Sequence, residues 1–344
     1  MNMTCTHRHQ PTDQVYLEAH FPLLVPPILA LIDDETISFK RRGCMLLSQF
    51  LNPIHESRSD ILRRTNLSSV FEDAIRPSFH SLPSITPEDE SIDLLAAAYM
   101  ALRFLIKTSY RSTSAENSKT PSTQRPKDSE TFISHTTKTL RDHLIPSFHH
   151  ISSTSSASGA SFASFPYPRL STLLLNQIAT TCADLNIHTT KYLQDIIPLV
   201  YSTLSNPFGT AHPPLLLSAL STTRAVILNT YPRIWRWRGE LLGAICSCWL
   251  HVLEDEDEKG SLGKDHSNKI VEFEKLKKEL KGSVYLLRYA LENPVDVDND
   301  EGQRQAKENI GTEIQMLVNA DESLQACLLA EIDPDDPSYF GFDT

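Results

Sequence analysis

The pattern of hydrophobic and polar positions along this chain follows the period of an α-helix. Over residues 36–52, small or apolar residues recur at i, i+4, i+7 and i+11, which places them on one face of a helix. These positions are Phe39, Gly43, Leu46 and Phe50. The segment 92–106 repeats the pattern, whereas alternation with a period of two occurs only at 234–238, inside a longer helical pattern. The sequence therefore predicts an all-α protein.

A repeat becomes visible when four prolines in similar apolar surroundings are aligned, namely Pro27, Pro77, Pro146 and Pro198. Their spacings are 50, 69 and 52 residues, and the longest interval contains the polar tract 112–130, which is too poor in apolar residues to pack. A period of about fifty residues with two helices per unit is typical of stacked helical hairpins. Because each hairpin buries only part of its apolar surface, neighbours must stack to complete the core. The predicted fold is a HEAT-like α-solenoid of stacked antiparallel helical hairpins.

The same reading gives the organisation of the chain. We expect a disordered N-terminus at 1–14, a single α-solenoid over 15–331 and a flexible acidic C-terminal tail at 332–344. Mobile polar loops are expected near 112–130, 152–166 and 254–268, the last including the acidic run Glu254–Glu258. The expected helices are 24–34, 36–52, 67–82, 88–109, 132–151, 168–187, 188–204, 213–230, 232–253, 270–291 and, as one helix or two, 303–331.

The composition of the chain argues against several classes of protein function. The 344 residues carry a formal net charge of −11, which argues against nucleic-acid binding because phosphate contacts need clustered Lys and Arg. Six cysteines do not have the density of a disulfide scaffold. The polar opening MNMTCTHRHQPTDQ does not resemble a signal peptide, and no segment reaches the ~18 uncharged apolar residues that span a bilayer. We expect a soluble intracellular protein that binds neither nucleic acid nor membrane.

Candidate chemical sites are few. Cys246 and Cys248 with His251 could be metal ligands, but the two cysteines lie about 200° apart on a helix and cannot share one ion without unwinding it. We expect them to be buried small residues in an apolar helix. No phosphate-binding, HExxH or GxSxG motif occurs. We therefore predict no catalytic, cofactor-binding or metal-binding residue. A weak metal site at the N-terminus is less favoured than a frayed end; its residues would be Cys5, His7 and His9.

The segment 232–238 mixes cations with aromatic rings, which could indicate base stacking. Helical geometry favours another interpretation, since the helix 232–253 is apolar over most of its circumference and has one narrow polar stripe. Such a helix is enclosed by neighbours or docks a partner. Arg238 lies off the stripe, so it should need a carboxylate or aromatic partner. The basic pairs Arg41-Arg42 and Arg63-Arg64 are expected to form structural salt bridges. The candidate partner-binding residues are Arg41, Arg42, Arg233, Trp235, Arg236 and Arg238.

Four strings of this sequence resemble landmarks of the Tel-two-interacting protein two family. They are DDETISFKRRGCMLL (33–47), ILRRTNLSSVFEDAIRP (61–77), LPSITPEDES (82–91) and NTYPRIWRWRGELLGAICSCWL (229–250). The chain departs from the family pattern at Asn66, where Gly is usual, and at Tyr231, where Trp is usual. Asn tolerates positive φ nearly as well as Gly, so the turn should be kept.

The resemblance implies a non-catalytic scaffold subunit of the TTT co-chaperone complex. Its partners would be two larger α-solenoid subunits and, indirectly, the ninety-kilodalton heat-shock chaperone machinery and the phosphatidylinositol-3-kinase-related kinases, whose maturation the complex supports. These kinases act in DNA-damage and nutrient signalling, and we expect the chain in cytoplasm and nucleus. Two alternatives are a generic HEAT-like adaptor unrelated to kinase maturation, and an unrecognised hydrolase or metal enzyme.

Overall fold

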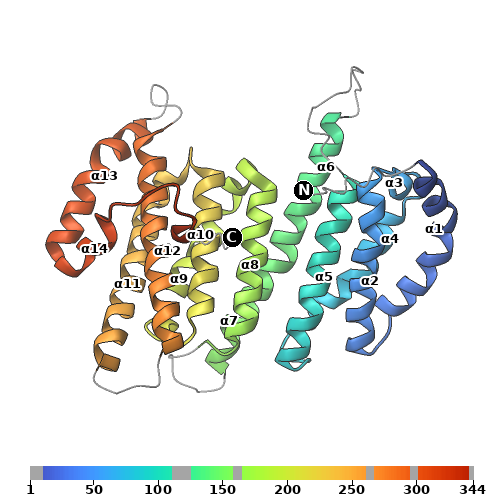
Figure 1. Ribbon diagram of the computed structural model, residues 1–344, viewed down its shortest axis with the longest axis horizontal. Helices are drawn as coiled ribbons and strands as arrows, with labels where there is room; N and C mark the ends of the chain where they lie inside the picture. The colour runs from blue at the N-terminus through green and yellow to red at the C-terminus, as the bar shows by residue number, and fades with distance from the viewer. Residues whose placement is uncertain (1–10, 111–124, 158–164, 261–266, 295–300, 341–344) are drawn as a thin grey trace, which may run out of the picture. The chain divides into compact units, whose positions relative to one another are not determined.

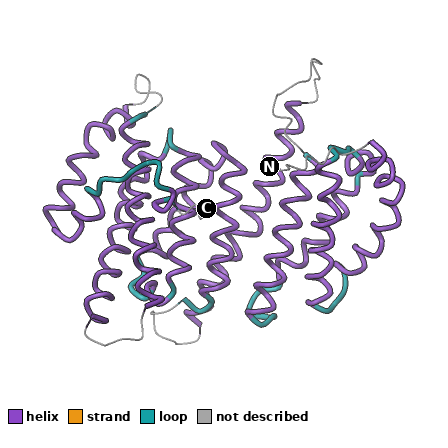
Figure 2. Tube along the Cα trace, in the orientation of Figure 1, coloured by secondary structure: helices purple, strands orange, loops and turns teal. Residues whose placement is uncertain are grey.

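The computed structural model describes residues 11–110, 125–157, 165–260, 267–294 and 301–340, and all regular secondary structure in these ranges is helical (Figure 1; Figure 2). None of the helices in these ranges is long and apolar enough to cross a membrane. By its internal contacts the chain divides into two compact units, residues 1–139 and 140–344. The single solenoid expected over 15–331 stays a prediction.

The first unit is built from two stacked hairpins. Its elements are α1 (Pro11–Ile32), α2 (Ile37–Glu56), α3 (Ile61–Thr65), α4 (Leu67–Ile75), the 3₁₀ turn η1 (Arg76–His80), α5 (Glu88–Ser109) and α6 (Arg125–Lys138). Helix α1 packs against α2 and α4, and α5 packs against α2, α4 and α6. Helices α1 and α4 thus form one layer, and α2 and α5 form the other (Figure 1).

The second unit also consists of helices stacked in two layers. Its elements are the π-helical turn η2 (Thr139–Leu144), α7 (Ile145–Ala157), α8 (Pro168–Leu185), η3 (Asn186–Tyr192), α9 (Leu193–Leu204), η4 (Gly209–Ala211), α10 (Pro213–Thr230), η5 (Ile234–Trp237), α11 (Arg238–Gly260), α12 (Ser267–Glu292), α13 (Glu301–Ala320), η6 (Glu322–Leu324), α14 (Gln325–Leu328) and η7 (Pro337–Tyr339). Helices α8, α10 and α12 lie side by side in one layer, while α9 and α11 lie in the other (Figure 1). Both units therefore have the all-α, solenoid-like fold that the sequence predicts.

The four prolines that define the repeat lie in equivalent places. Pro27 is in α1, Pro77 in η1 after α4, Pro146 in α7 and Pro198 in α9, so each lies in the first helix of a hairpin or in the turn directly after it. Proline has no N–H to donate to the carbonyl four residues earlier, and its ring crowds that carbonyl. Irregular turns accompany two of these prolines: the 3₁₀ turn η1 contains Pro77, and the π-helical turn η2 directly precedes α7.

Proline and charge also explain where long helices begin. Pro168 and Pro213 occupy the first turns of α8 and α10, where a missing N–H costs nothing. Helix α5 follows Pro87 and carries three carboxylates in its first turn, which complement the positive end of the helix dipole. Helices α5 and α10 have the predicted bounds, 88–109 and 213–230.

Two positions fix the local geometry of the first unit. Asn66 joins α3 to α4 with φ 54° and ψ 23°, in the left-handed region, so its predicted tolerance of positive φ is confirmed. Gly43 lies where α2 crosses α1, and a β-carbon there would lie 2.7 Å from the backbone nitrogen of Ile32. The apolar face of α2 therefore contains a glycine because the two helices touch at that point.

The prediction for the acidic run is wrong. Glu254–Glu258 was expected in a polar loop but continues α11, which extends to Gly260. Helix α11 packs against α12 there, and Glu256 pairs with Lys277 of α12 at 2.7 Å, which supplies a countercharge for the run. Residues 125–130 and 152–157, also expected in loops, are helical in α6 and α7, while 111–124, 158–164 and 261–266 lie outside the described residues.

The segment 332–340 lies along α12. Its turn η7 packs on Gly282, where a β-carbon would overlap the carbonyl oxygen of Tyr339. The Nζ atom of Lys278 lies 6.0 Å from the centre of the Tyr339 ring, and the rings of Phe340 and Tyr285 are 6.2 Å apart. The segment thus packs against α12 through defined contacts, while the flexibility expected of the tail stays a prediction.

Candidate partner-binding surface

Four of the six predicted partner-binding residues lie together at the junction of η5 and α11. Ile234 is fully buried and anchors the 3₁₀ turn. Arg233 and Arg236 are exposed, while Trp235 and Arg238 are half-buried. The structure therefore brings these four residues into one region of the second unit but gives them different surroundings.

Arg238 is held in a bidentate ion pair with Glu313 of α13. Its Nε donates to Oε2 at 3.0 Å and its Nη2 donates to Oε1 at 2.7 Å. The Nη1 atom donates to the carbonyl oxygen of Trp235 at 2.9 Å. The prediction that Arg238 needs a carboxylate or aromatic partner is confirmed. Because paired guanidinium–carboxylate bonds are among the stronger polar contacts, Arg238 fixes α13 against η5.

Trp235 belongs to the same internal contact. Its indole ring lies on Gly302 at the start of α13, where a β-carbon would overlap the ring. Next to it, the side-chain amide of Gln303 donates to the carbonyl oxygen of Pro232 at 2.7 Å. The Nε1 atom of Trp235 is buried and has no hydrogen-bond partner in the described part of the chain. Trp235 and Arg238 thus join α13 to η5, and their role in partner binding stays a prediction.

Helix α11 is enclosed by its neighbours, as its apolar pattern indicates. It packs against α9, α12 and η6. Trp249 is buried, its Nε1 donates to the carbonyl oxygen of Ser323 at 3.0 Å, and Lys281 lies 5.6 Å from the centre of its ring. Arg236 and Glu240, on the polar stripe, are exposed. Core packing therefore accounts for most of this helix.

The cysteines of α11 are buried, as predicted. Burial raises the pKa of the Cys246 thiol to about 11 and that of Cys248 to about 12. Such thiols stay protonated near neutral pH and are poor nucleophiles and poor metal ligands. Within the described ranges, no group of three or more His, Cys, Asp or Glu residues could hold a metal ion. The N-terminal residues Cys5, His7 and His9 lie outside those ranges.

Arg41 and Arg42 lie on α2, in the first unit. The Nη1 atom of Arg41 is 3.2 Å from Oδ2 of Asp93 on α5, so the predicted salt bridge between repeats forms. The two side chains are 46% and 57% exposed, and a pair this accessible stabilises a protein by at most about 1 kcal/mol. Arg42 is exposed. A partner role for this pair stays a prediction.

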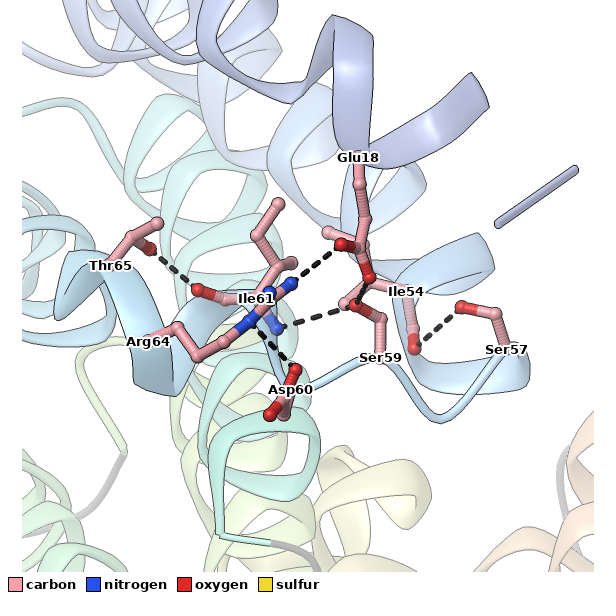
Figure 3. Close-up of polar contacts among 8 residues, drawn as sticks. All are labelled: Glu18, Ile54, Ser57, Ser59, Asp60, Ile61, Arg64 and Thr65. Atoms are coloured by element: carbon pink, nitrogen blue, oxygen red, sulfur yellow. Dashed lines mark hydrogen bonds and ion pairs between the residues drawn. The ribbon is translucent and has the colours of Figure 1, made fainter. Parts of the chain in front are cut away.

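Arg64 takes part in the polar network shown in Figure 3. Its Nη2 donates to Oε2 of Glu18 at 2.5 Å, and its Nε lies 2.9 Å from Oδ1 of Asp60. The other oxygen of Glu18 accepts from the Ser59 hydroxyl at 2.7 Å (Figure 3). One carboxylate of α1 thus holds both the connection after α2 and helix α3. The predicted structural salt bridge at Arg63-Arg64 is confirmed for Arg64.

A deeply buried ion pair between α10 and α12 was not predicted from the sequence. Arg224 of α10 donates to Glu279 of α12 at 2.9 Å, and the two side chains are only 9% and 3% exposed. Burial lowers the pKa of the Arg224 guanidinium, and the nearby Glu279 carboxylate opposes that shift. The sequence contained one sign of this pair, because Arg224 is the charged residue in the otherwise uncharged segment 213–230. Its partner could not be identified in the same way, since Glu279 is 55 residues away.

A surface pocket of about 270 Å³ opens beside η5. Its lining residues come from η3, α9 and η5 with the residue before it, and they are Thr190, Lys191, Leu193, Gln194, Arg233, Arg236 and Trp237. The guanidinium of Arg236 lies 5.5 Å from the centre of the Trp235 ring, in a cation–π contact. Two predicted partner-binding residues, Arg233 and Arg236, therefore share this pocket with Lys191.

Stacked hairpins in two layers, joined by ion pairs between helices, define the class: this is an all-α, solenoid-like protein. The model of the Tti2 family matches residues 3–211, more than half of the chain, and the chain belongs to that family. Three of the four landmark strings lie inside the matched range, and the resemblance is confirmed. Membership of this family implies a role as a component of the TTT complex. No curated protein and no solved structure matches the chain.

Proposed function

We propose that this chain is a non-catalytic scaffold subunit of the TTT complex, supporting the maturation and stability of phosphatidylinositol-3-kinase-related kinases. The observation that carries the proposal is the match to the Tti2 family over residues 3–211. Its partners would be two larger α-solenoid subunits, with the heat-shock chaperone machinery and the kinases associated indirectly. It would act in the cytoplasm and the nucleus.

The physical character of the chain is consistent with a binding role. Two of the charged pairs serve packing: Arg238 with Glu313 joins α11 to α13, and Arg224 with Glu279 joins α10 to α12. The thiols of Cys44, Cys182, Cys246, Cys248 and Cys327 are all buried, and burial raises the pKa of each. A stack of hairpins offers long exposed helical faces, which suit contact with another stack.

Affinity purification of the tagged chain from its native cell, with mass spectrometry of the proteins recovered, tests the proposal. We expect two large helical-repeat proteins, chaperone components and very large kinases. Recovery of none of these from a stable monomer would contradict the proposal and leave the generic adaptor. Stoichiometric metal in the purified chain, found by elemental analysis, would favour an enzyme instead.

A further inference from the structure

The pocket beside η5 collects positive charge from separate parts of the chain. Lys191 comes from η3, while Arg233 and Arg236 come from the turn that begins α11. No carboxylate is among the residues that line it. In the described part of the chain, Lys191 and Arg236 form no ion pair. Lys191 and Arg236 repel one another across the hollow that both line, and an anion placed between them would remove that repulsion.

This local charge stands out against the rest of the molecule. The chain has a formal net charge of −11, and several other cations of the second unit have carboxylate partners. Arg224, Arg238 and Lys277, for example, pair with glutamates at 2.7–2.9 Å. The pocket is therefore a positive site in an acidic protein, which favours an anionic group over a neutral one.

The walls of the pocket limit what can enter it. Leu193 is 3% exposed and Trp237 is half-buried, so the pocket has an apolar side next to its cations. The indole of Trp235 lies on Gly302, and the guanidinium of Arg236 lies over that indole, which holds the cation at the rim. A volume of about 270 Å³ suits one or two side chains rather than a folded surface.

We infer that this pocket binds a carboxylate or phosphate group carried by a side chain in an extended segment of a partner protein. Lys191 and Arg236 would contact the anionic group, the amide of Gln194 would add a polar contact, and Trp237 would cover the neighbouring apolar atoms. The inference rests on the proposed function, because it names the chemistry of a partner for a binding protein. The anion could be an aspartate or glutamate, or a phosphorylated serine or threonine.

A nucleic acid is the less favoured occupant. Phosphate-backbone binding needs a stripe of cations that neutralises several phosphates in succession, whereas the cations here surround one hollow. The ring of Trp235 lies between Gly302 and the guanidinium of Arg236, so it offers no free face for stacked bases. A peptide segment needs only one anionic side chain at this point.

Fluorescence anisotropy on the full chain tests the inference. The probe is a short labelled Gly-Ser peptide that carries three consecutive glutamates, and matched peptides carry three phosphoserines or three alanines. We expect binding of the glutamate peptide, the phosphoserine peptide or both, weakening as salt rises, and no binding of the alanine peptide. The double variant Lys191→Ala/Arg236→Ala should weaken binding about tenfold or more, because charge-assisted hydrogen bonds are lost.

A second double variant is the matched control. Arg304→Ala/Lys307→Ala removes two exposed cations from α13, in the same unit and with the same change in net charge, and should bind like the parent chain. Equal binding of anionic and alanine peptides, or equal loss in both double variants, would overturn the inference. So would tight binding of a labelled single-stranded oligonucleotide that depends on Arg236 while no peptide binds.

The peptide-binding experiment and the affinity purification can fail independently of each other. If the parent chain recovers the two helical-repeat partners but binds no anionic peptide through Lys191 and Arg236, the inference fails and the scaffold role stands. If the peptides bind as expected but those partners are not recovered, the scaffold role fails and the pocket keeps its ligand class.

Discussion

Burial decides which charged residues of this protein matter for stability. Arg41 and Asp93 are about half exposed and contribute little, whereas Arg224 and Glu279 are almost fully enclosed between α10 and α12. A buried pair is costly to desolvate, so its net value over apolar residues is small. Removing one partner of the pair is strongly destabilising, because the remaining charge is then buried in apolar surroundings without a countercharge.

Glu279→Leu should therefore lower the free energy of unfolding by about 3–5 kcal/mol, since Arg224 loses its only close countercharge in the described structure. Urea denaturation followed by circular dichroism measures the change. Glu292→Leu is the control, because Glu292 pairs with Arg288 at the surface and its loss should cost less than about 1 kcal/mol. The double variant Arg224→Met/Glu279→Leu should recover most of the loss; a double variant as unstable as the single one would refute this account.

Individual elements of the second unit are positioned by close contacts at glycine. Gly302 admits the ring of Trp235, and Gly282 admits the backbone of Tyr339. The second contact seats η7 on α12, with Lys278 and Tyr285 on either side of it. A helix interior otherwise disfavours glycine, so Gly282, which lies inside α12, is consistent with a requirement for close approach.

Gly282→Ala should release the segment 332–340 from α12, because the new β-carbon overlaps the Tyr339 carbonyl oxygen. Hydrogen exchange of the backbone amides in 332–340 should become faster, while α12 itself should keep its protection or gain from the better helix former. Gly311→Ala is the matched control, since a β-carbon on α13 at this position meets no atom within 4 Å. Unchanged exchange in Gly282→Ala would show that Gly282 does not seat the segment.

At the scale of the whole molecule, stacked hairpins depend on their neighbours. Each helix in a layer is covered by the next one, so a terminal helix has no neighbour on one side. In the first unit, Leu23 of α1 is 70% exposed and Leu24 is 47% exposed. A partner solenoid that binds the folded chain should therefore stabilise it.

If the scaffold role is correct, co-purified helical-repeat partners should raise the melting temperature of this chain. Binding to the folded state alone adds about 2.7 kcal/mol when the free partner is at 100 times its Kd. Differential scanning fluorimetry of the chain alone and with each partner measures the shift. An unrelated helical-repeat protein at the same concentration should give no shift, and equal melting temperatures with and without the proposed partners would contradict the role.

Much of the architecture could be predicted from local pattern. The period of the apolar residues predicts α5 and α10 to their final bounds, and the alignment of Pro27, Pro77, Pro146 and Pro198 predicts the hairpin to which each belongs. Local pattern also showed that Arg238 needs a partner and that Cys246 and Cys248 are buried. The landmark strings led to the family. These features depend on residues within one or two helical turns of each other, or on a repeat of such turns.

The rest was decided by contacts between residues far apart in the chain. Glu313 pairs with Arg238 from 75 residues away, and Glu279 pairs with Arg224 from 55 residues away. Lys277 of α12 pairs with Glu256, which lies in the acidic run at the end of α11. Lys191 and Arg236, which are also far apart in the chain, line the same pocket. The sequence by itself determined most of the helices, their pairing into hairpins and the family. Only the tertiary structure decided which charges are paired, because stacking sets which faces of distant helices meet.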